Sequence, residues 1–321
     1  MESETQEDII GGANATRSNA VKIIDEIHHG IVGKDSLIYN MLIALLAEGN
    51  VMLEGLPGVA KTTIAKTFAS VMGMEFKRVQ FTPDIMPTDV IGACILNQKT
   101  MEFEVHQGPV FTNILLVDEI NRASPKVQSS LLEAMEEKQV SIEGTSINLP
   151  DPFMVITTLN PVDILGTFPL PEAQIDRFMF RLNVDYPTFD EELELLHFKS
   201  RGQVPAHGMM TKDEVSGMIS SIRQVYVDEK VLKYIRDLVM ATRANKKLIL
   251  GASPRASISL LKASRAVAAL NGRDYVILDD VKYLIPPVMN HRLVIKPEYE
   301  PEGVTVNDIV DELMASVKVP T

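Results

Sequence analysis

The sequence predicts an α/β protein in which a mainly parallel five-stranded sheet is followed by an all-helical domain. Two observations predict this fold: short apolar runs alternate with helical stretches in the first half of the chain, and helix caps follow one another in the second. The runs expected to form strands are residues 51–54, 76–81, 114–117, 153–159 and 178–184. Parallel strands joined by helices bind ligands at their carboxyl ends, so we expect a site there.

Length and composition favour two domains with a substantial core. The chain has 321 residues, of which 45% are hydrophobic, and we expect an α/β domain over residues 1–187 and a helical domain over residues 188–321. The net charge of −12 argues against nonspecific nucleic-acid binding, which requires a surplus of Lys and Arg. A single cysteine, an acidic N-terminus and no run of roughly 20 apolar residues lead us to expect a soluble cytoplasmic protein.

A glycine-rich segment after the first strand has the spacing of a phosphate-binding loop. Backbone N–H groups at the following helix would cradle the phosphates, Lys61 would reach the outer ones, and the Thr62 hydroxyl would complete the coordination of Mg²⁺. The residues expected to bind nucleotide here are Gly55, Pro57, Gly58, Val59, Ala60, Lys61, Thr62 and Thr63. The alternative is a turn that binds nothing, but the flanking strand and helix favour a nucleoside triphosphate site.

One position in this loop departs from the common pattern. The residue before the lysine is Ala60, where the pattern GxxxxGK[ST] has glycine. Because a methyl group disfavours positive φ, we expect alanine to be tolerated if residue 60 is already helical.

Acidic and polar residues follow two other expected strands. Asp118 and Glu119 come after a buried apolar run, and Asn160 follows the run at 153–159. Asp118 would hold Mg²⁺ directly or through water, and Glu119 would orient the attacking water or accept its proton. The acidic pair could instead cap a helix. Since the loop, the acidic pair and Asn160 all follow strands, we expect these three segments to converge on one site.

A hairpin and several helix boundaries can also be placed. Residues 93–107 predict a hairpin that turns near residues 97–99, with an ordinary surface hairpin as the alternative. The expected helix starts are Thr211 with Glu214, Asp228, Ser253 with Pro254, and Asp279 with Asp280. Pro286 and Pro287 are expected to kink or end the last of these helices. The charged run Glu133, Glu136, Glu137 and Lys138 is expected to be a solvated helix face.

Longer stretches of the chain closely resemble the MoxR branch of AAA+ ATPases. They are GLPGVAKT (55–62), QFTPDIMPTDVIG (80–92), GPVFTNILLVDEINRASPKVQSSLLEAMEEKQV (108–140), LNP (159–161), LPEAQIDRFMF (170–180) and GASPRA (251–256). Even Ala60 matches, because MoxR proteins characteristically carry alanine there. The resemblance implies a P-loop AAA+ core with a helix-2 insert at about 93–107, a helical lid, and a Mg²⁺-dependent ATPase that forms oligomers, often hexamers. It further implies a chaperone-like role in remodelling, assembly or metal-cofactor maturation of client proteins, with partners that carry von Willebrand factor A domains.

The same resemblance assigns roles to individual residues. Asn160 looks like the sensor of the γ-phosphate, and Arg177 looks like the arginine finger donated to the ATP of a neighbouring subunit. Arg255 resembles the second sensor, and the sequence leaves open whether it acts in its own subunit or on a neighbour. Val32 and Gly33 would line the adenine pocket.

Each of these roles has a simpler alternative. Asn160 could form an Asn-Pro turn, Arg177 could pair with Asp176 at the surface, and Arg255 could be solvated. Val32 could be plain core. Less securely still, Gln80 could couple its strand to Glu119 as a polar switch.

Three functions remain open at this point. The preferred one is an ATP hydrolase of MoxR type. The second is a DNA-directed AAA+ motor, such as a helicase or a transcription activator, which the net charge disfavours. The third is a nucleotide-loaded scaffold with little turnover, which the presence of Glu119, Asn160 and Arg177 disfavours.

Overall fold

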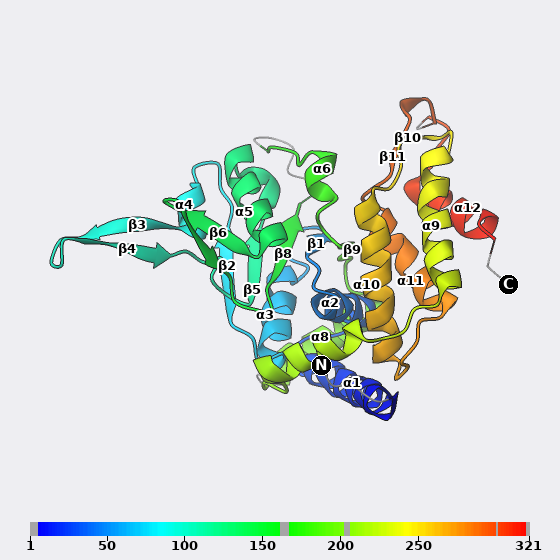
Figure 1. Ribbon diagram of the computed structural model, residues 1–321, viewed down its shortest axis with the longest axis horizontal. Coiled ribbons are helices and arrows are strands. Elements are labelled where there is room, and N and C mark those ends of the chain that lie inside the picture. Colours follow the sequence, from blue (N-terminus) through cyan, green and yellow to red (C-terminus); the bar gives the residue numbers. More distant parts are fainter. Residues whose placement is uncertain (1–5, 161–166, 202–205, 300, 319–321) are drawn as a thin grey trace.

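The centre of the molecule is a five-stranded parallel sheet with the strand order β2-β5-β8-β1-β9. The computed structural model describes residues 6–160, 167–201, 206–299 and 301–318 (Figure 1). The strands are β1 (Val51–Glu54), β2 (Phe76–Gln80), β5 (Ile114–Asp118), β8 (Met154–Leu159) and β9 (Phe180–Asn183). All five predicted strands are confirmed, with small differences at their ends.

Hydrophobic cores lie on both faces of this sheet. Strand β5 is buried throughout, with Ile114 and Leu116 facing one core and Leu115 and Val117 facing the other, as the two-residue period of a strand requires. The first core contains α1 (Gln6–His28), α2 (Asp35–Leu46) and α3 (Lys61–Val71), and the second contains α4 (Pro87–Ile91) and α5 (Pro125–Glu137). The sheet therefore has helices on both faces, as predicted.

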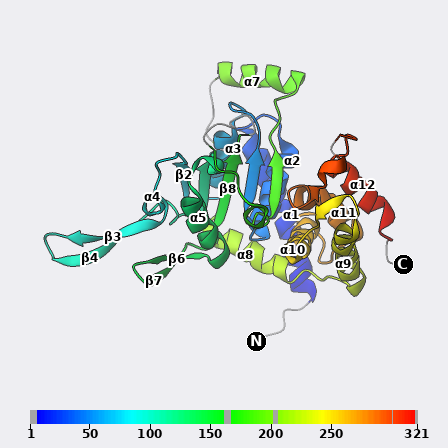
Figure 2. The same ribbon diagram turned by 90° about the horizontal axis from the view of Figure 1, so that it is seen from above.

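Two hairpins project from the same side of the sheet domain (Figures 1 and 2). Strands β3 (Gly92–Asn97) and β4 (Glu102–Gln107) form the hairpin that the sequence predicts. The other joins β6 (Gln139–Ile142) to β7 (Thr145–Asn148) and was not predicted. Its turn residues, Glu143 and Gly144, both have positive φ, which gives the twist that a tight hairpin needs. Its arms have only four residues each, so the alternation of Val140 and Ile142 with polar residues in β6 is a short signal.

The second half of the chain is mainly helical. The helices after the short α6 (Glu172–Ile175) are α7 (Phe189–Arg201), α8 (Lys212–Arg223), α9 (Glu229–Ala244), α10 (Pro254–Leu270), α11 (Leu278–Met289) and α12 (Val306–Ser316). The predicted caps Thr211, Asp228 and Ser253 accept hydrogen bonds from the first turns of α8, α9 and α10. A short antiparallel pair, β10 (Leu248–Leu250) with β11 (Val294–Ile295), adds to the helices.

Helix α11 differs from expectation at its two prolines. It continues through Pro286 and Pro287 to Met289, so these residues do not end it.

No helix in the described part of the chain has both the length and the apolar character needed to cross a membrane.

The helical part shares its core with the first face of the sheet. Buried side chains from α8 to α12 form one continuous cluster with those of α1, α2 and α3. Helix α10 lies against both α1 and α2, and α8 packs against the same two helices. Helix α7 stands apart from this packing (Figure 2). The predicted division at residues 187 and 188 falls between β9 and α7 and stays a prediction.

One buried guanidinium joins the start of β9 to the end of α11. Arg292 donates from Nε to Asp176 Oδ1 at 2.8 Å, and its two Nη groups donate to the carbonyls of Asp176, Phe178, Met179 and Val288. All five donors of a guanidinium can be used in such a planar arrangement. Arg292 therefore fixes the helical part to the sheet through both charge and geometry.

The neighbouring His291 reinforces this junction. Its Nε2 lies 3.0 Å from the carbonyl oxygen of Phe178, so Nε2 carries the proton and donates it. Burial lowers the pKa of this imidazole well below its ordinary value, and the adjacent Arg292 lowers it further. The folded protein therefore holds His291 neutral.

We predict that Arg292→Ala lowers the free energy of unfolding by about 3–5 kcal/mol, because it leaves Asp176 and several carbonyls without their buried donor. Denaturant unfolding would measure this loss. Arg292→Lys should recover little of it, since an ammonium group cannot reach the same set of acceptors. The exposed pair of Lys282 with Asp279 provides the control, and Lys282→Ala should cost less than about 1 kcal/mol. Equal losses for the two alanine variants would contradict the assigned role.

We also predict that His291 makes the protein less stable in acid. Because the unfolded chain binds a proton below pH 6.5 that the folded protein excludes, stability should fall by up to about 1.4 kcal/mol for each pH unit below that value. His291→Gln keeps a donor for Phe178 and should flatten this slope, measured by urea unfolding from pH 7 to about pH 5. His106→Gln, at an exposed position, is the control. An unchanged slope in His291→Gln would refute the prediction.

Candidate functional site

The predicted phosphate loop lies between β1 and α3. Glycine suits Gly55 and Gly58 for different structural reasons. A Cβ at Gly55 would lie 2.4 Å from the carbonyl oxygen of Val184, so the backbone leaves no room for a side chain. Gly58 has φ of +86° with open space around it, so its requirement is conformational. The loop therefore has close packing at its start and a positive φ in its middle.

Ala60 does not have the conformation expected from the sequence. It is the N-cap of α3 and has left-handed angles, with φ 62° and ψ 20°, so it lies outside the helix rather than in its first turn. This conformation costs an L-residue with a Cβ roughly 1–2 kcal/mol of conformational energy. The chain thus carries local backbone strain directly before Lys61.

Lys61 points back across the loop. Its Nζ donates to the carbonyl of Gly55, and it lies 3.4 Å from the carbonyl of Leu159 at the end of β8. Burial lowers the pKa of this ammonium group, while the charges of Asp118, Glu119 and Glu54 oppose that shift. Weak backbone acceptors therefore hold a partly desolvated cation at the place where anionic phosphates are expected.

Asp118 lies beside this lysine and is almost fully buried. Thr62 Oγ1 is 3.4 Å from Asp118 Oδ2, and Thr158 Oγ1 donates to Asp118 Oδ1 at 3.2 Å. The guanidinium of Arg78 forms an ion pair with Oδ2 at 2.6 Å. The hydroxyl and the carboxylate expected to face Mg²⁺ are therefore together, with a cation that balances the carboxylate.

Glu119 stands one residue beyond the end of β5, in the left-handed region with φ of 57°. Its Oε2 accepts from Gln80 Nε2 at 2.8 Å and pairs with Arg122 Nη1 at 2.9 Å. The backbone N–H of Glu119 donates to Thr158 Oγ1 at 2.9 Å. The predicted contact between Gln80 and Glu119 is thus confirmed, and the carboxylate is oriented from two sides.

Three residues at this site were missed in the sequence. Arg78 shares a face of β2 with Gln80, and the parallel register places Gln80 opposite Asp118. Because Arg78 lies two residues before Gln80 on the same strand, its closeness to Asp118 could have been inferred once that register was known. Arg122, three residues after Glu119, had only the spacing of a local ion pair, and Thr158 lay inside an apolar run without distinguishing features.

Asn160 lies where the sequence placed it, directly after β8. It is 7% exposed and follows Leu159, whose carbonyl is the one near Lys61 Nζ. The proline of the predicted Asn-Pro turn, Pro161, lies outside the described residues. The loop, the acidic pair and Asn160 therefore meet at the carboxyl edge of the sheet, as predicted.

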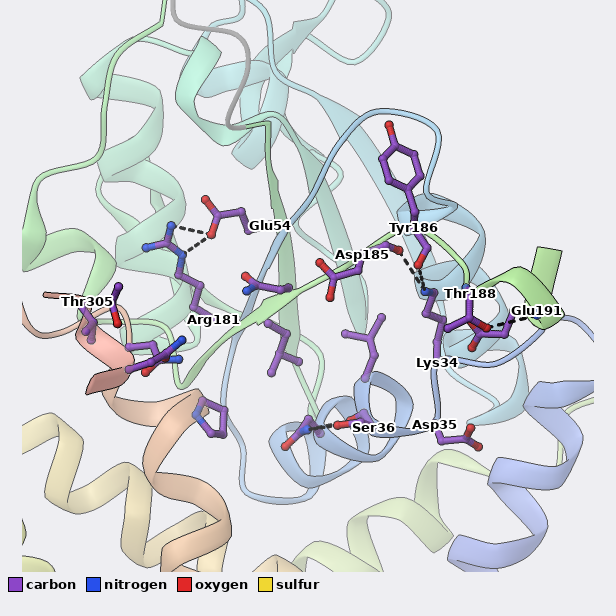
Figure 3. A pocket seen from close by; sticks show the side chains of 18 residues that line it. Lys34, Asp35, Ser36, Glu54, Arg181, Asp185, Tyr186, Thr188, Glu191 and Thr305 are labelled. Carbon is purple, nitrogen blue, oxygen red and sulfur yellow. Dashed lines mark hydrogen bonds and ion pairs between the residues drawn. The ribbon is translucent and has the colours of Figure 1, made fainter. Parts of the chain in front are cut away.

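A cavity of about 840 Å³ adjoins this edge (Figure 3). Glu54, the last residue of β1, lines it and is bound by Arg181 at 2.6 Å. On the opposite side, Lys34 Nζ donates to the carbonyls of Asp185 and Tyr186 at 3.0 and 3.3 Å (Figure 3). The size and mixed polarity of this cavity suit a small-molecule ligand.

The predicted adenine-pocket residues Val32 and Gly33 immediately precede Lys34 at this cavity. Val32 is half-buried, so it is not simply part of the core. Gly33 has φ of +63°, and a Cβ there would lie 1.9 Å from Glu191 Oε1 at the start of α7. The positive φ favours glycine here, whereas the Glu191 side chain could move aside for a Cβ.

Arg177 and Arg255 lie together, at the opposite end of the sheet. Arg177 Nη1 is 3.3 Å from Glu136 Oε2, and Arg255 Nη2 contacts the other oxygen of the same carboxylate. Arg255 also lies 3.6 Å from Asp176. Arg177 precedes β9, so the length of a strand of four residues, roughly 13 Å, separates its backbone from the edge of the sheet where the phosphate loop lies.

This arrangement corrects three expectations. Asp176 does not pair with Arg177, because it is occupied by Arg292 and by the Ser253 hydroxyl. Arg255 is held by carboxylates rather than by solvent alone. The charged run at the end of α5 is not only a solvated face, because Glu136 binds both arginines and Lys138 pairs with Glu48.

The side chains at the carboxyl edge fit a magnesium nucleotide. Thr62 and Asp118 supply the hard oxygen donors that Mg²⁺ prefers, at one point beside the N-terminus of α3. Lys61 and the tight turn at Gly55 and Gly58 supply a cationic cradle for phosphates. The described part of the chain contains no group of three or more His, Cys, Asp or Glu side chains arranged to hold a metal ion, so magnesium would reach this edge together with the nucleotide's phosphates.

Comparison with known proteins agrees with this fold. The family model described as "ATPase family associated with various cellular activities (AAA)" matches residues 50–180, and the AAA lid domain model matches residues 240–313. The fold and the site thus define an AAA-type ATPase.

Relatives along nearly the whole chain identify the branch. Chaperone MoxR1 of Mycobacterium tuberculosis is 42% identical, covering 93% of this chain and 82% of its own, and YeaC of Bacillus subtilis is 47% identical, covering 93% and 94%. A structure from Cytophaga hutchinsonii, provisionally described as an ATPase, superposes with a TM-score of 0.91 at 38% identity and covers 97% of this chain and 98% of its own. The chain belongs to the MoxR family of AAA+ ATPases.

Proposed function

We propose that this protein binds and hydrolyses ATP with Mg²⁺ as a MoxR-type AAA+ motor. The observation that carries the proposal is the meeting of Lys61, Thr62 with Asp118, and Glu119 at one edge of the sheet. These are the cation, the metal ligands and the carboxylate that phosphoryl transfer to water requires.

Each side chain has a distinct task in this proposal. Lys61 exchanges its backbone acceptors for phosphate oxygens, a stronger and charge-assisted interaction. Magnesium held by Thr62 and Asp118 would neutralise charge on the phosphates. Glu119 orients the attacking water and accepts its proton, and its contacts with Gln80 and Arg122 position it. Asn160 adds a polar contact to the water or the γ-phosphate.

Arg177 and Arg255 are proposed to act on the nucleotide of a neighbouring subunit. Both lie at the amino edge of the sheet, too far from their own phosphate loop to reach it, and Glu136 holds them side by side. This placement supports action in trans for Arg255 as well as for Arg177. It also implies a head-to-tail arrangement in which one subunit completes the site of the next, and such an interface closes into a ring. A hexamer is the ring size we propose.

The cellular role is proposed from membership of the family. Several relatives are named MoxR, and one of them is named a chaperone. We therefore propose that ATP turnover remodels client proteins during their assembly or metal-cofactor maturation, with a partner that carries a von Willebrand factor A domain.

The central test compares Lys61→Ala with Glu119→Gln. We expect Lys61→Ala to lose nucleotide binding, because a buried phosphate charge then has no cation. We expect Glu119→Gln to bind ATP while turnover falls by about 10²–10⁴. Calorimetry with ATP and a phosphate-release assay would measure the two effects. Lys66→Ala, an exposed position on the same helix, is the control and should change neither. Turnover that survives Glu119→Gln would overturn the site.

A mixing experiment tests action in trans. We expect Arg177→Ala to lower turnover by about 10³–10⁵ without weakening ATP binding to an isolated subunit. Mixing it with Glu119→Gln subunits should restore part of the activity, because some sites then combine an intact Glu119 with a neighbour's intact Arg177. Turnover per subunit should also rise as light scattering shows oligomers forming. Failure of the mixture to exceed the sum of the two variants would contradict the shared site.

A further inference from the structure

A cationic cleft lies at the amino edge of the sheet, at the opposite end of β1 from the phosphate loop. It encloses about 580 Å³ between the turn that leads into β1, the end of α5, the end of α8 and the middle of α10. Its charged lining is Glu48, Lys138, Arg223, Lys262 and Arg265. Four cations and one carboxylate leave a surplus of positive charge, in a chain whose net charge is −12.

Two of these cations are accounted for by the protein itself. Lys138 and Arg223 contact the two carboxylate oxygens of Glu48 at 2.8 and 2.6 Å. Burial opposes ionisation of Glu48, but these hydrogen bonds and charges outweigh it and lower its pKa to about 2. Both cations also end helices, where the helix dipole favours positive charge.

The other two cations lack any such explanation. Lys262 and Arg265 lie in the middle of α10, and neither forms an ion pair or a hydrogen bond with any described residue. The Nε of Arg265 is buried, again with no partner among the described residues. A buried guanidinium donor without an acceptor costs free energy, so an anion or a water molecule that supplied an acceptor here would be stabilising.

We propose that this cleft binds a small anion that carries at least two phosphate groups. The cations come from three helices and surround a space of small-molecule size, so separate phosphates can meet separate cations. The planar fork of Arg265 suits bidentate contact with phosphate oxygens, and Lys262 adds a mobile point charge. The cleft is separate from the phosphate loop of its own chain, and Glu48 and Lys262 also line the adjoining pocket that contains Arg177 and Arg255.

Calorimetric titration of the full chain with inorganic pyrophosphate tests this proposal. The double variant Lys262→Gln with Arg265→Gln should bind the probe at least tenfold more weakly than the wild type, because two charged contacts are lost. The control, Lys233→Gln with Arg236→Gln, removes the same number of charges from α9 and should bind as the wild type does. Inorganic phosphate should bind more weakly than pyrophosphate to the wild type.

Further variants keep the test decisive. Lys61→Ala should retain pyrophosphate binding in the cleft, and loss of all binding in this variant would show that only the phosphate loop was titrated. If the double variant melts at lower temperature, the exposed Lys262→Glu alone should still weaken binding severalfold. Equal weakening in the α9 control, equal affinity for phosphate and pyrophosphate, or no binding to the wild type would each overturn the proposal.

Discussion

The position of the helical part of the chain against the sheet depends on the buried ion pair between Arg292 and Asp176. It ties the last turn of α11 to the residues that lead into β9. Asp176 also receives the Ser253 hydroxyl that caps α10, and Arg255 follows in that first turn. One carboxylate thus sets the direction from which α10 approaches the sheet. Removing one partner of such a pair would leave the other charge buried and uncompensated.

In this geometry, two groups of charged side chains lie at opposite edges of one sheet. Lys61, Thr62, Asp118 and Glu119 lie at the carboxyl edge, where arginines pair with the carboxylates, whereas Arg177 and Arg255 lie at the amino edge around Glu136. Neither edge alone contains everything that the proposed reaction needs. The strands are short, but their length already exceeds the reach of a side chain, so the separation is fixed by the sheet and not by loop conformation.

Local patterns predicted the parts of this structure that local physics determines. Apolar runs, the glycine-rich loop and the helix caps act over a few residues, so the five strands, Lys61, Thr62 and the cap at Ser253 were placed correctly. Contacts between distant segments were not visible in this way. The pairing of Arg78 with Asp118 depends on strand register. The ion pairs of Glu136 with Arg177 and Arg255 depend on how α10 packs against the sheet domain. Ala60 shows the same limit, because the shape of the loop outweighs the preference of the residue for negative φ.

One continuous core joins the first three helices to α8 to α12, across the expected boundary at residues 187 and 188. A fragment that ended near residue 187 would leave the apolar sides of α1 and α2 open to water, since α8 and α10 are what cover them. Exposed surface of that kind drives aggregation rather than independent folding. The expected division at residues 187 and 188 follows the change from strands to helices, whereas a cut there would divide a buried cluster to which both sides contribute.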